Sequence, residues 1–162
     1  MSLVLTIQNR QRTRPVNQRL LRQIVTTLLD DLLETKTVEL GVTLIAAPEM
    51  TRLNGAFLQH EGSTDVITFD YSEPQTPDPR PQITGELFIC IDDAVLQAKR
   101  FRTTWQSELI RYIVHGVLHL LGHDDHRAAD RRKMKREENR LVRRLAVRFP
   151  LSRLARNPRL RR

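Results

Sequence analysis

Four of the five histidines of this chain lie within twelve residues, in the segment HGVLHLLGHDDH that runs from His115 to His126. The preceding residues, ELIRYIV, have apolar side chains at helical spacing, which predicts a helix over 104–121. Positions four residues apart share one face of a helix, so His115 and His119 present two imidazoles to one point. Gly122 is typical of the left-handed residue at which a helix ends. The sequence therefore predicts a helix and a sharp turn with histidines on both sides.

The histidine segment has the residue types of a catalytic zinc site. Beyond the turn, Asp125 or His126 is placed to add a third ligand to His115 and His119. Three protein ligands with a fourth position left for water are typical of catalytic zinc, because the ion lowers the pKa of that water. The alternative is a pair of core histidines on a helix with a polar end. The i,i+4 spacing followed by a second His/Asp cluster favours one bound zinc ion.

The residue that follows the first histidine of the pair limits the chemistry. Zinc metalloproteases of this layout have a Glu at that position, where it acts as general base. This chain has Gly116 there, so peptide hydrolysis by that mechanism lacks its base. Hydrolysis of another ester at a zinc ion does not need this side chain. The sequence therefore disfavours a metalloprotease-like hydrolase.

Strand and helix patterns interleave along the chain, which indicates an α+β fold with a small mixed sheet of about four strands covered by helices. We expect a single domain over residues 1–150, with the metal site on a helix and turn in its C-terminal half. Residues 151–162 are expected to form a basic, disordered tail. The predicted strands are 3–8, 37–46, 66–69 and 85–91, and the predicted helices are 16–34, a short one from Pro48, one from about Asp93, 104–121 and 127–147.

Positive charge is concentrated at the C-terminal end. Residues 127–162 contain fifteen Arg and Lys and three acidic residues, a formal net charge of +12, whereas residues 1–126 carry −4. A localised basic segment points to a polyanion, with nucleic acid favoured over an acidic membrane surface. The alternative is a solvated Arg-rich helix. The helix residues expected to bind nucleic acid are Arg131, Arg132, Lys133, Lys135 and Arg136, and the tail arginines expected to add to binding without stabilising the fold are Arg153, Arg156, Arg159, Arg161 and Arg162.

Composition also predicts the cellular context. A single cysteine, Cys90, excludes an internal disulfide and fits a reducing compartment. No apolar stretch is long enough to span a bilayer, and the N-terminus MSLVLTIQNRQRTRP lacks the basic start and the cleavage site of a signal peptide. We therefore expect a cytoplasmic protein with no membrane and no disulfide partner.

Taken together, the motifs resemble the signature of the YbeY family, which are bacterial single-domain, metal-dependent endoribonucleases. HGVLHLLGHDDH is similar to the metal motif of that family, and MTRLNGAFLQHEGSTDVITF and GELFICIDDA are similar to two upstream segments in the same order. The resemblance covers about residues 38–145. It implies an α+β fold, one zinc ion held by three side chains and single-stranded RNA as substrate. It also implies a role in ribosomal RNA maturation, at the 3′ end of 16S rRNA, and in ribosome quality control, with the small ribosomal subunit as partner.

The chain departs from the family pattern at several positions. The third ligand of the family is usually a His six residues after the second, and here that position is Asp125. Asp125 keeps the spacing and is favoured as ligand, with His126 as the alternative. His123 occupies a position that is usually aromatic and is expected to be structural or to support a ligand. Leu58 stands where the family commonly has an Arg that supports RNA cleavage. Contact with phosphate must then come from another residue or be absent, and the nearby candidates are Arg52 and His60.

Residues upstream of the histidine segment receive further predictions. Asn54, Thr64 and Asp65 match the upstream motif of the family, although Thr64 and Asp65 are equally typical of a turn that enters a strand. Glu86 is expected either to orient a ligand histidine or to pair with an Arg across the sheet. Two further residues are expected in the core, Cys90 and Trp105.

The favoured hypothesis is a zinc-dependent endoribonuclease that acts on ribosomal RNA. The alternative from another class is a non-catalytic ribosome-assembly factor that uses its metal structurally and its basic segment to bind RNA. A coordination position open to water favours the enzyme, whereas a fourth protein ligand such as His123 favours the assembly factor.

Overall fold

The computed structural model describes residues 1–58, 64–73 and 80–156. The strands are β1 (Ser2–Asn9), β2 (Thr37–Ile45), β3 (Val66–Asp70) and β4 (Gln82–Cys90). The α-helices are α1 (Gln18–Thr27), α2 (Ala47–Leu53), α3 (Ile91–Phe101), α4 (Trp105–Leu120) and α5 (Ala128–Arg148). Two π-helical segments, η1 (Leu28–Leu32) and η2 (Asn54–Leu58), continue α1 and α2, and η3 (Leu151–Ala155) is a 3-10 helix. The predicted α+β class is confirmed.

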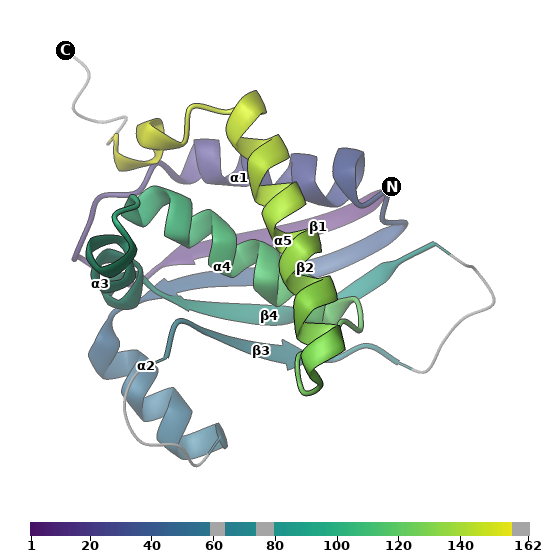
Figure 1. The fold of residues 1–162 in the computed structure, drawn as a ribbon, viewed down its shortest axis with the longest axis horizontal. Helices are drawn as coiled ribbons and strands as arrows, with labels where there is room; N and C mark the ends of the chain where they lie inside the picture. Colours follow the sequence, from purple (N-terminus) through teal and green to yellow (C-terminus); the bar gives the residue numbers. More distant parts are fainter. Residues whose placement is uncertain (59–63, 74–79, 157–162) are drawn as a thin grey trace.

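The four strands form one mixed sheet in the order β1-β2-β4-β3. β1 is parallel to β2, and β2 is parallel to β4, while β3 runs antiparallel to β4 at the edge (Figure 1). Because parallel neighbours need a crossover, the chain passes through α1 and η1 between β1 and β2. The register pairs Ile45 with Cys90, so β2 and β4 end together at the edge from which α2 and α3 begin.

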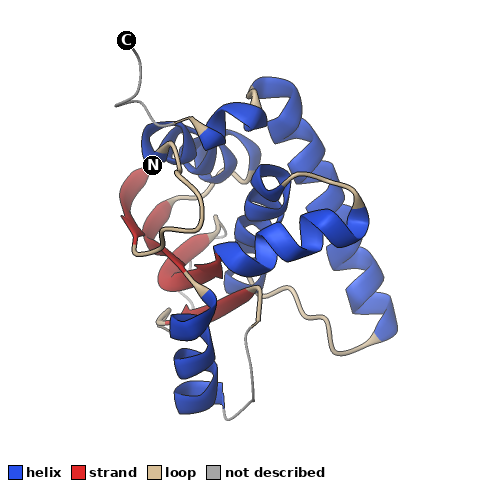
Figure 2. Cartoon of the chain, turned by 90° about the vertical axis from the view of Figure 1, so that its left-hand side faces the viewer, coloured by secondary structure: helices blue, strands red, loops and turns tan. Residues whose placement is uncertain are grey.

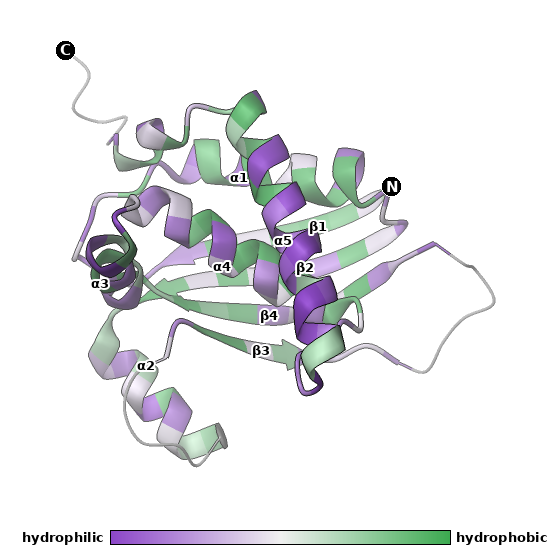
Figure 3. Ribbon diagram, viewed as in Figure 1, coloured by the Kyte–Doolittle hydropathy of each residue, from purple (hydrophilic) through white to green (hydrophobic). Residues whose placement is uncertain are grey.

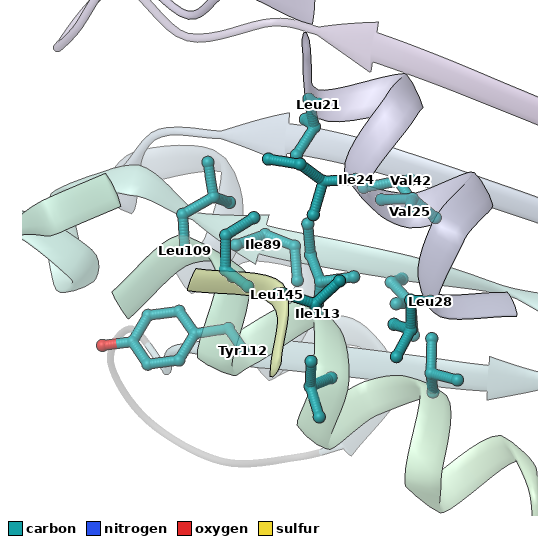
Figure 4. Close-up of a cluster of buried hydrophobic side chains, with 14 of the residues drawn as sticks. Leu21, Ile24, Val25, Leu28, Val42, Ile89, Leu109, Tyr112, Ile113 and Leu145 are labelled. Carbon is teal, nitrogen blue, oxygen red and sulfur yellow. The ribbon is translucent and has the colours of Figure 1, made fainter. Parts of the chain in front are cut away.

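Alternation along the strands gives the sheet two apolar faces. On one face, Val42 of β2 and Ile89 of β4 belong to the main core, which they share with α1, α4 and α5. Figure 4 shows side chains of these three helices meeting those of the two strands. On the opposite face, Ile45 and Cys90 form a smaller cluster with Met50 of α2. The sheet is thus covered by most helices on one side and by α2 on the other (Figure 2).

α5 covers the main core with a narrow apolar face and is otherwise hydrophilic (Figure 3). Met134, Leu141 and Leu145 are buried. The helix also buries Glu138 on this same face. No helix in the described part of the chain combines the length and the apolar character needed to cross a membrane.

α1 begins later than its apolar pattern predicts. The pattern starts at Val16, but the helix starts at Gln18, because the side chain of Asn17 accepts a hydrogen bond from the backbone N–H of Leu20 at 3.1 Å and caps the first turn. Val16 is nevertheless buried in the main core. The apolar spacing therefore predicts the burial of Val16 correctly, but it does not predict the residue at which the helix begins.

The C-terminal segment corrects the prediction of a disordered tail that starts at residue 151. Residues 151–155 form η3, and the Leu154 side chain is 0% exposed in the main core. The Leu154 carbonyl accepts a hydrogen bond from the Asn17 N–H at 2.8 Å. One fully buried Leu contributes about 1.5–3 kcal/mol, so this side chain is a substantial part of the contact between the segment and the core. The arginines at 159, 161 and 162 lie outside the described residues.

Removing the Leu154 side chain is expected to destabilise the protein. Leu154→Ala leaves a cavity in the main core, so we expect the free energy of unfolding to fall by about 2–5 kcal/mol. Urea denaturation followed by circular dichroism measures this change. Ser152→Ala, an exposed position in the same turn, is the matched control and should change stability by less than about 0.5 kcal/mol. Equal stabilities of the two variants would contradict docking of the segment.

Candidate metal centre and cleft

α4 positions both histidines of the predicted pair. Its N-terminus is capped by Thr104, whose side chain accepts a hydrogen bond from the backbone N–H of Ser107. Its C-terminus is followed by Gly122 with φ +94°, a conformation that residues with a Cβ rarely adopt. The N–H of His123 donates to the carbonyl of Leu118, which closes the turn. This turn sends the loop of residues 121–127 back past the end of α4 toward α5.

The ring nitrogens of the two histidines converge. The Nε2 atoms of His115 and His119 are 3.1 Å apart, and Oδ2 of Asp125 lies 3.6 Å from Nε2 of His119. The three side chains are half-buried, and their ligand atoms all lie within 4.8 Å of one another. The helix and the loop after Gly122 therefore bring together the three residues that the sequence favours as metal ligands.

The donor set fits a tetrahedral metal. Ligand atoms about 2.0–2.1 Å from a tetrahedral zinc ion are about 3.3 Å from one another. The separations of 3.1 and 3.6 Å in the structure lie on both sides of that value. Two imidazoles and a carboxylate are also donors that zinc accepts in proteins. The three residues present thus suit one ion of this size and preference.

His126, the alternative third ligand, belongs to a different cluster. Its ring lies beside Asp124, with Nε2 3.6 Å from Oδ1, and its side chain is 88% exposed. The cluster of Asp124, Asp125 and His126 does not include the histidines of α4. His123 turns its carbonyl, rather than its ring, toward the pair, since this oxygen lies 3.1 Å from Nδ1 of His119.

The surroundings of the two histidines shift their pKa values in opposite directions. The Glu138 carboxylate beside Nδ1 of His115, at 3.4 Å, raises the pKa of that imidazole. Burial lowers the pKa of His119, and the neighbouring His115 lowers it further. Both rings direct Nδ1 away from the cluster, toward Glu138 and the His123 carbonyl. Each imidazole therefore offers Nε2 to an ion.

Close packing explains the glycine between the histidines. A Cβ on Gly116 would lie 2.7 Å from Cδ2 of Leu87, a fully buried residue of β4. The helix thus approaches the sheet too closely for a side chain at this position. Gly116, which stands where a metalloprotease has its general base, therefore faces the core in this fold.

A cleft of about 990 Å³ adjoins the histidines and runs between α3, α4 and α5. Its lining includes His115, Asp125 and Glu138, and at its rim the Phe101 side chain is 63% exposed beside Arg100. The positively charged residues of the lining are Arg100, Arg111, Arg131, Arg132 and Lys135, and the acidic ones are Asp65, Glu108, Asp125 and Glu138.

The predicted nucleic-acid-binding residues of α5 divide into two groups. Arg131, Arg132 and Lys135 line the cleft, whereas Lys133 and Arg136 do not. The Arg131 guanidinium also donates to the carbonyls of Asp125 and His126, at 3.3 and 3.0 Å, so it ties α5 to the loop that carries Asp125.

The upstream residues have varied outcomes. Asp65 lines the cleft, and its carboxylate accepts a hydrogen bond from the N–H of Val66 at 2.8 Å, as expected of a residue that enters a strand. Asn54 is buried. Leu58 ends η2, and His60 lies outside the described residues. Arg52 is exposed on α2 and is not part of the cleft lining. Cys90 is buried in the core as expected, and Trp105 is partly buried and packs against the main core.

Glu86 is not the carboxylate that supports a ligand histidine. Its side chain lies beside Gly41 and accepts a hydrogen bond from the Tyr71 hydroxyl at 3.1 Å, on the face of the sheet opposite α4. The strand alternation of β4 places Leu87, not Glu86, under the histidine helix. The residue beside His115 is instead Glu138, which the sequence analysis missed. The sequence does contain an indication of this role, because Glu138 is an acidic residue at the same helical spacing as the apolar residues Met134 and Leu141.

Comparisons with known proteins identify a matching family model, similar sequences and a similar fold. The family model described as Endoribonuclease YbeY matches residues 6–146. An Endoribonuclease YbeY of Salinibacter ruber is 31% identical over 141 residues, which cover 85% of this chain and 89% of the relative. An Endoribonuclease YbeY of Myxococcus xanthus is 37% identical over 110 residues, which cover 68% of this chain but only 37% of that longer relative. A solution structure from Thermotoga maritima shares the fold, with a TM-score of 0.66 and 21% identity over 98% of this chain and 100% of that one.

Proposed function

The chain belongs to the YbeY endoribonuclease family, and from that membership we propose that it is a zinc-dependent endoribonuclease that cleaves single-stranded ribosomal RNA. The observation that carries the proposal is the convergence of His115, His119 and Asp125 at a cleft with cationic walls. A metal site alone fits many hydrolases, and a basic surface alone fits many binding proteins. Their junction in one cleft fits hydrolysis of a polyanion.

The proposed metal ligands are Nε2 of His115, Nε2 of His119 and a carboxylate oxygen of Asp125. When bound, a zinc ion supplies Lewis-acid polarisation of a phosphoryl oxygen and activation of water at neutral pH. Nδ1 of His119 lies against the His123 carbonyl, which keeps its ring turned toward the cluster. Three protein ligands, with the His123 ring outside the cluster, favour a site open to water over the closed site of an assembly factor.

The side chains that line the cleft bind the RNA strand. Arg100, Arg131 and Arg132 bring positive charge to the lining, where they neutralise backbone phosphates. Phe101 is 63% exposed in this lining and is the aromatic side chain on which an unpaired base would stack. From His115 back to Glu108 the cleft follows α4 for about 10 Å, because a helix rises 1.5 Å per residue. Bases that remain paired cannot stack on such a face, so the cleft favours single strands.

We further propose the wider setting implied by the family. The RNA is ribosomal RNA, with the 3′ end of 16S rRNA as the cleavage region, and the small ribosomal subunit is the partner that presents it. This places the protein in the cytoplasm and in ribosome quality control. The concentration of positive charge in the C-terminal part of the chain supports RNA as the partner.

The histidine pair tests the proposed metal site. Replacing both His115 and His119 with Ala removes two of three ligands, so we expect bound zinc to fall from about one ion per chain to almost none. Elemental analysis measures the zinc, and digestion of a single-stranded RNA with and without chelator measures the activity, which should be lost in both conditions. Circular dichroism checks that the fold persists. Stoichiometric zinc in the double variant would contradict the site.

Two single variants of the loop identify the third ligand. We expect Asp125→Ala to weaken zinc binding at least about 10-fold, because its carboxylate joins the histidine pair. His126→Ala is the matched control, since it is the neighbouring residue and its exposed ring lies in the other cluster. Competition with a chelating dye gives both affinities. A larger loss in His126→Ala would reverse the assignment.

A second pair of variants tests the cleft as the RNA site. Arg132 and Lys133 are exposed neighbours on α5, but only Arg132 lines the cleft. In metal-free protein, which does not cleave, we expect Arg132→Gln to weaken binding of single-stranded RNA. The slope of log affinity against log salt should also flatten by about 0.7, the value for one phosphate contact. Lys133→Gln should leave the slope unchanged. Equal effects of the two variants would mean that net charge, not the cleft, binds RNA.

A further inference from the structure

Glu138 occupies a position where an apolar side chain is expected. It lies one helical turn from Met134 and Leu141 on the buried face of α5, and it is only 4% exposed. Burial of a carboxylate is costly unless charged or hydrogen-bonded partners compensate it, and an apolar residue of similar volume is often as stable or more stable there. Packing alone therefore does not account for an acidic residue at this position.

Three cationic or titratable groups surround this carboxylate. Nδ1 of His115 is 3.4 Å from Oε1, while Lys135 Nζ and Arg111 Nη1 are 3.2 and 3.4 Å from Oε2. Burial raises the pKa of Glu138, but the neighbouring His115 and Lys135 outweigh it and hold that pKa below its usual value. The two oxygens thus face in different directions, one to the histidine and one to the cations.

We propose that Glu138 is a positioning residue that orients His115 toward the metal and holds Arg111 and Lys135 in the wall of the cleft; this inference rests on the proposed function. Glu138 contacts Nδ1 and leaves Nε2 facing His119. A carboxylate behind a ligand imidazole fixes its ring and increases its basicity as a metal ligand.

The same carboxylate connects the metal centre to the cleft. Arg111 and Lys135 both line the cleft, and both reach Oε2 of Glu138. Arg111 is also held by Asn139, whose side-chain oxygen accepts its hydrogen bond at 2.7 Å. Glu138 therefore holds two cations of the cleft lining, Arg111 and Lys135, at the point where that lining meets His115.

Glu138→Met distinguishes this role from a structural one. Methionine keeps the volume and removes the charge, so a residue that only fills space should tolerate the change with equal or higher stability and unaltered zinc binding. We expect zinc affinity, measured by competition with a chelating dye, to fall about 10- to 100-fold. The Co²⁺-substituted protein should also show a shifted absorption spectrum, because the His115 ring is no longer held.

Glu137 provides the matched control. It is the adjacent acidic residue on α5, and it pairs with Arg140 on the same helix rather than with His115. Glu137→Gln should keep the zinc affinity and the Co²⁺ spectrum of the parent protein. Glu138→Gln, which keeps the shape but removes the charge, is the second test if Glu138→Met fails to fold, and it should lower zinc affinity in the same direction.

The outcomes separate this inference from the proposed function. Parent-like zinc affinity in a folded Glu138→Met or Glu138→Gln variant overturns the positioning role, whatever the activity on RNA. Absence of RNA cleavage by a zinc-loaded parent protein overturns the proposed function but leaves the positioning result intact. An equal loss of zinc affinity in Glu137→Gln would also overturn the inference, since it would reflect the charge of the helix and not the contact with His115.

Discussion

The close approach of α4 to β4 is the contact on which the site depends. Gly116 lies so near Leu87 that a side chain would not fit between helix and strand. Because Gly116 turns one side of α4 to the sheet, His115 and His119 lie on an adjacent side of the helix, where both are half-buried. The same packing removes the position that a metalloprotease uses for its base. The packing of one glycine against the sheet therefore accounts for the absence of that base.

Much of this arrangement could be predicted because its signals are local. The i,i+4 spacing of His115 and His119 and the turn at Gly122 lie within eight residues, so helix geometry alone brings them together. Asp125 is placed by the same turn. The strands were also recognisable, since alternation and β-branched residues act within one strand. Only their order in the sheet, which depends on pairing between distant segments, was not available from these patterns.

The errors share a different cause, namely contacts between residues far apart in the chain. Leu154 docks against the core and against Asn17, which no pattern within residues 151–162 indicates. The prediction that Glu86 supports a ligand histidine is wrong because strand position alone does not say which face of the sheet meets α4. Glu138 could have been found, since it interrupts the apolar face of a basic helix, but its partner His115 is on another element. The composition of that helix indicates its positive charge but not the role of one buried acidic residue.

Charge and geometry contribute differently to the interpretation of α5. The formal charge of residues 127–162 indicates a polyanion partner but does not select one side of the helix. The structure makes that selection, because Arg131, Arg132 and Lys135 line the cleft while Lys133 and Arg136 lie outside its lining. Within the cleft, the acidic residues balance most of the cations locally, and Glu138 sits between two of the cations and a histidine. In the proposed RNA complex, the strand would meet an ordered set of charges next to the proposed metal ligands rather than a uniformly basic surface, and positioning of this kind favours reaction at one phosphate.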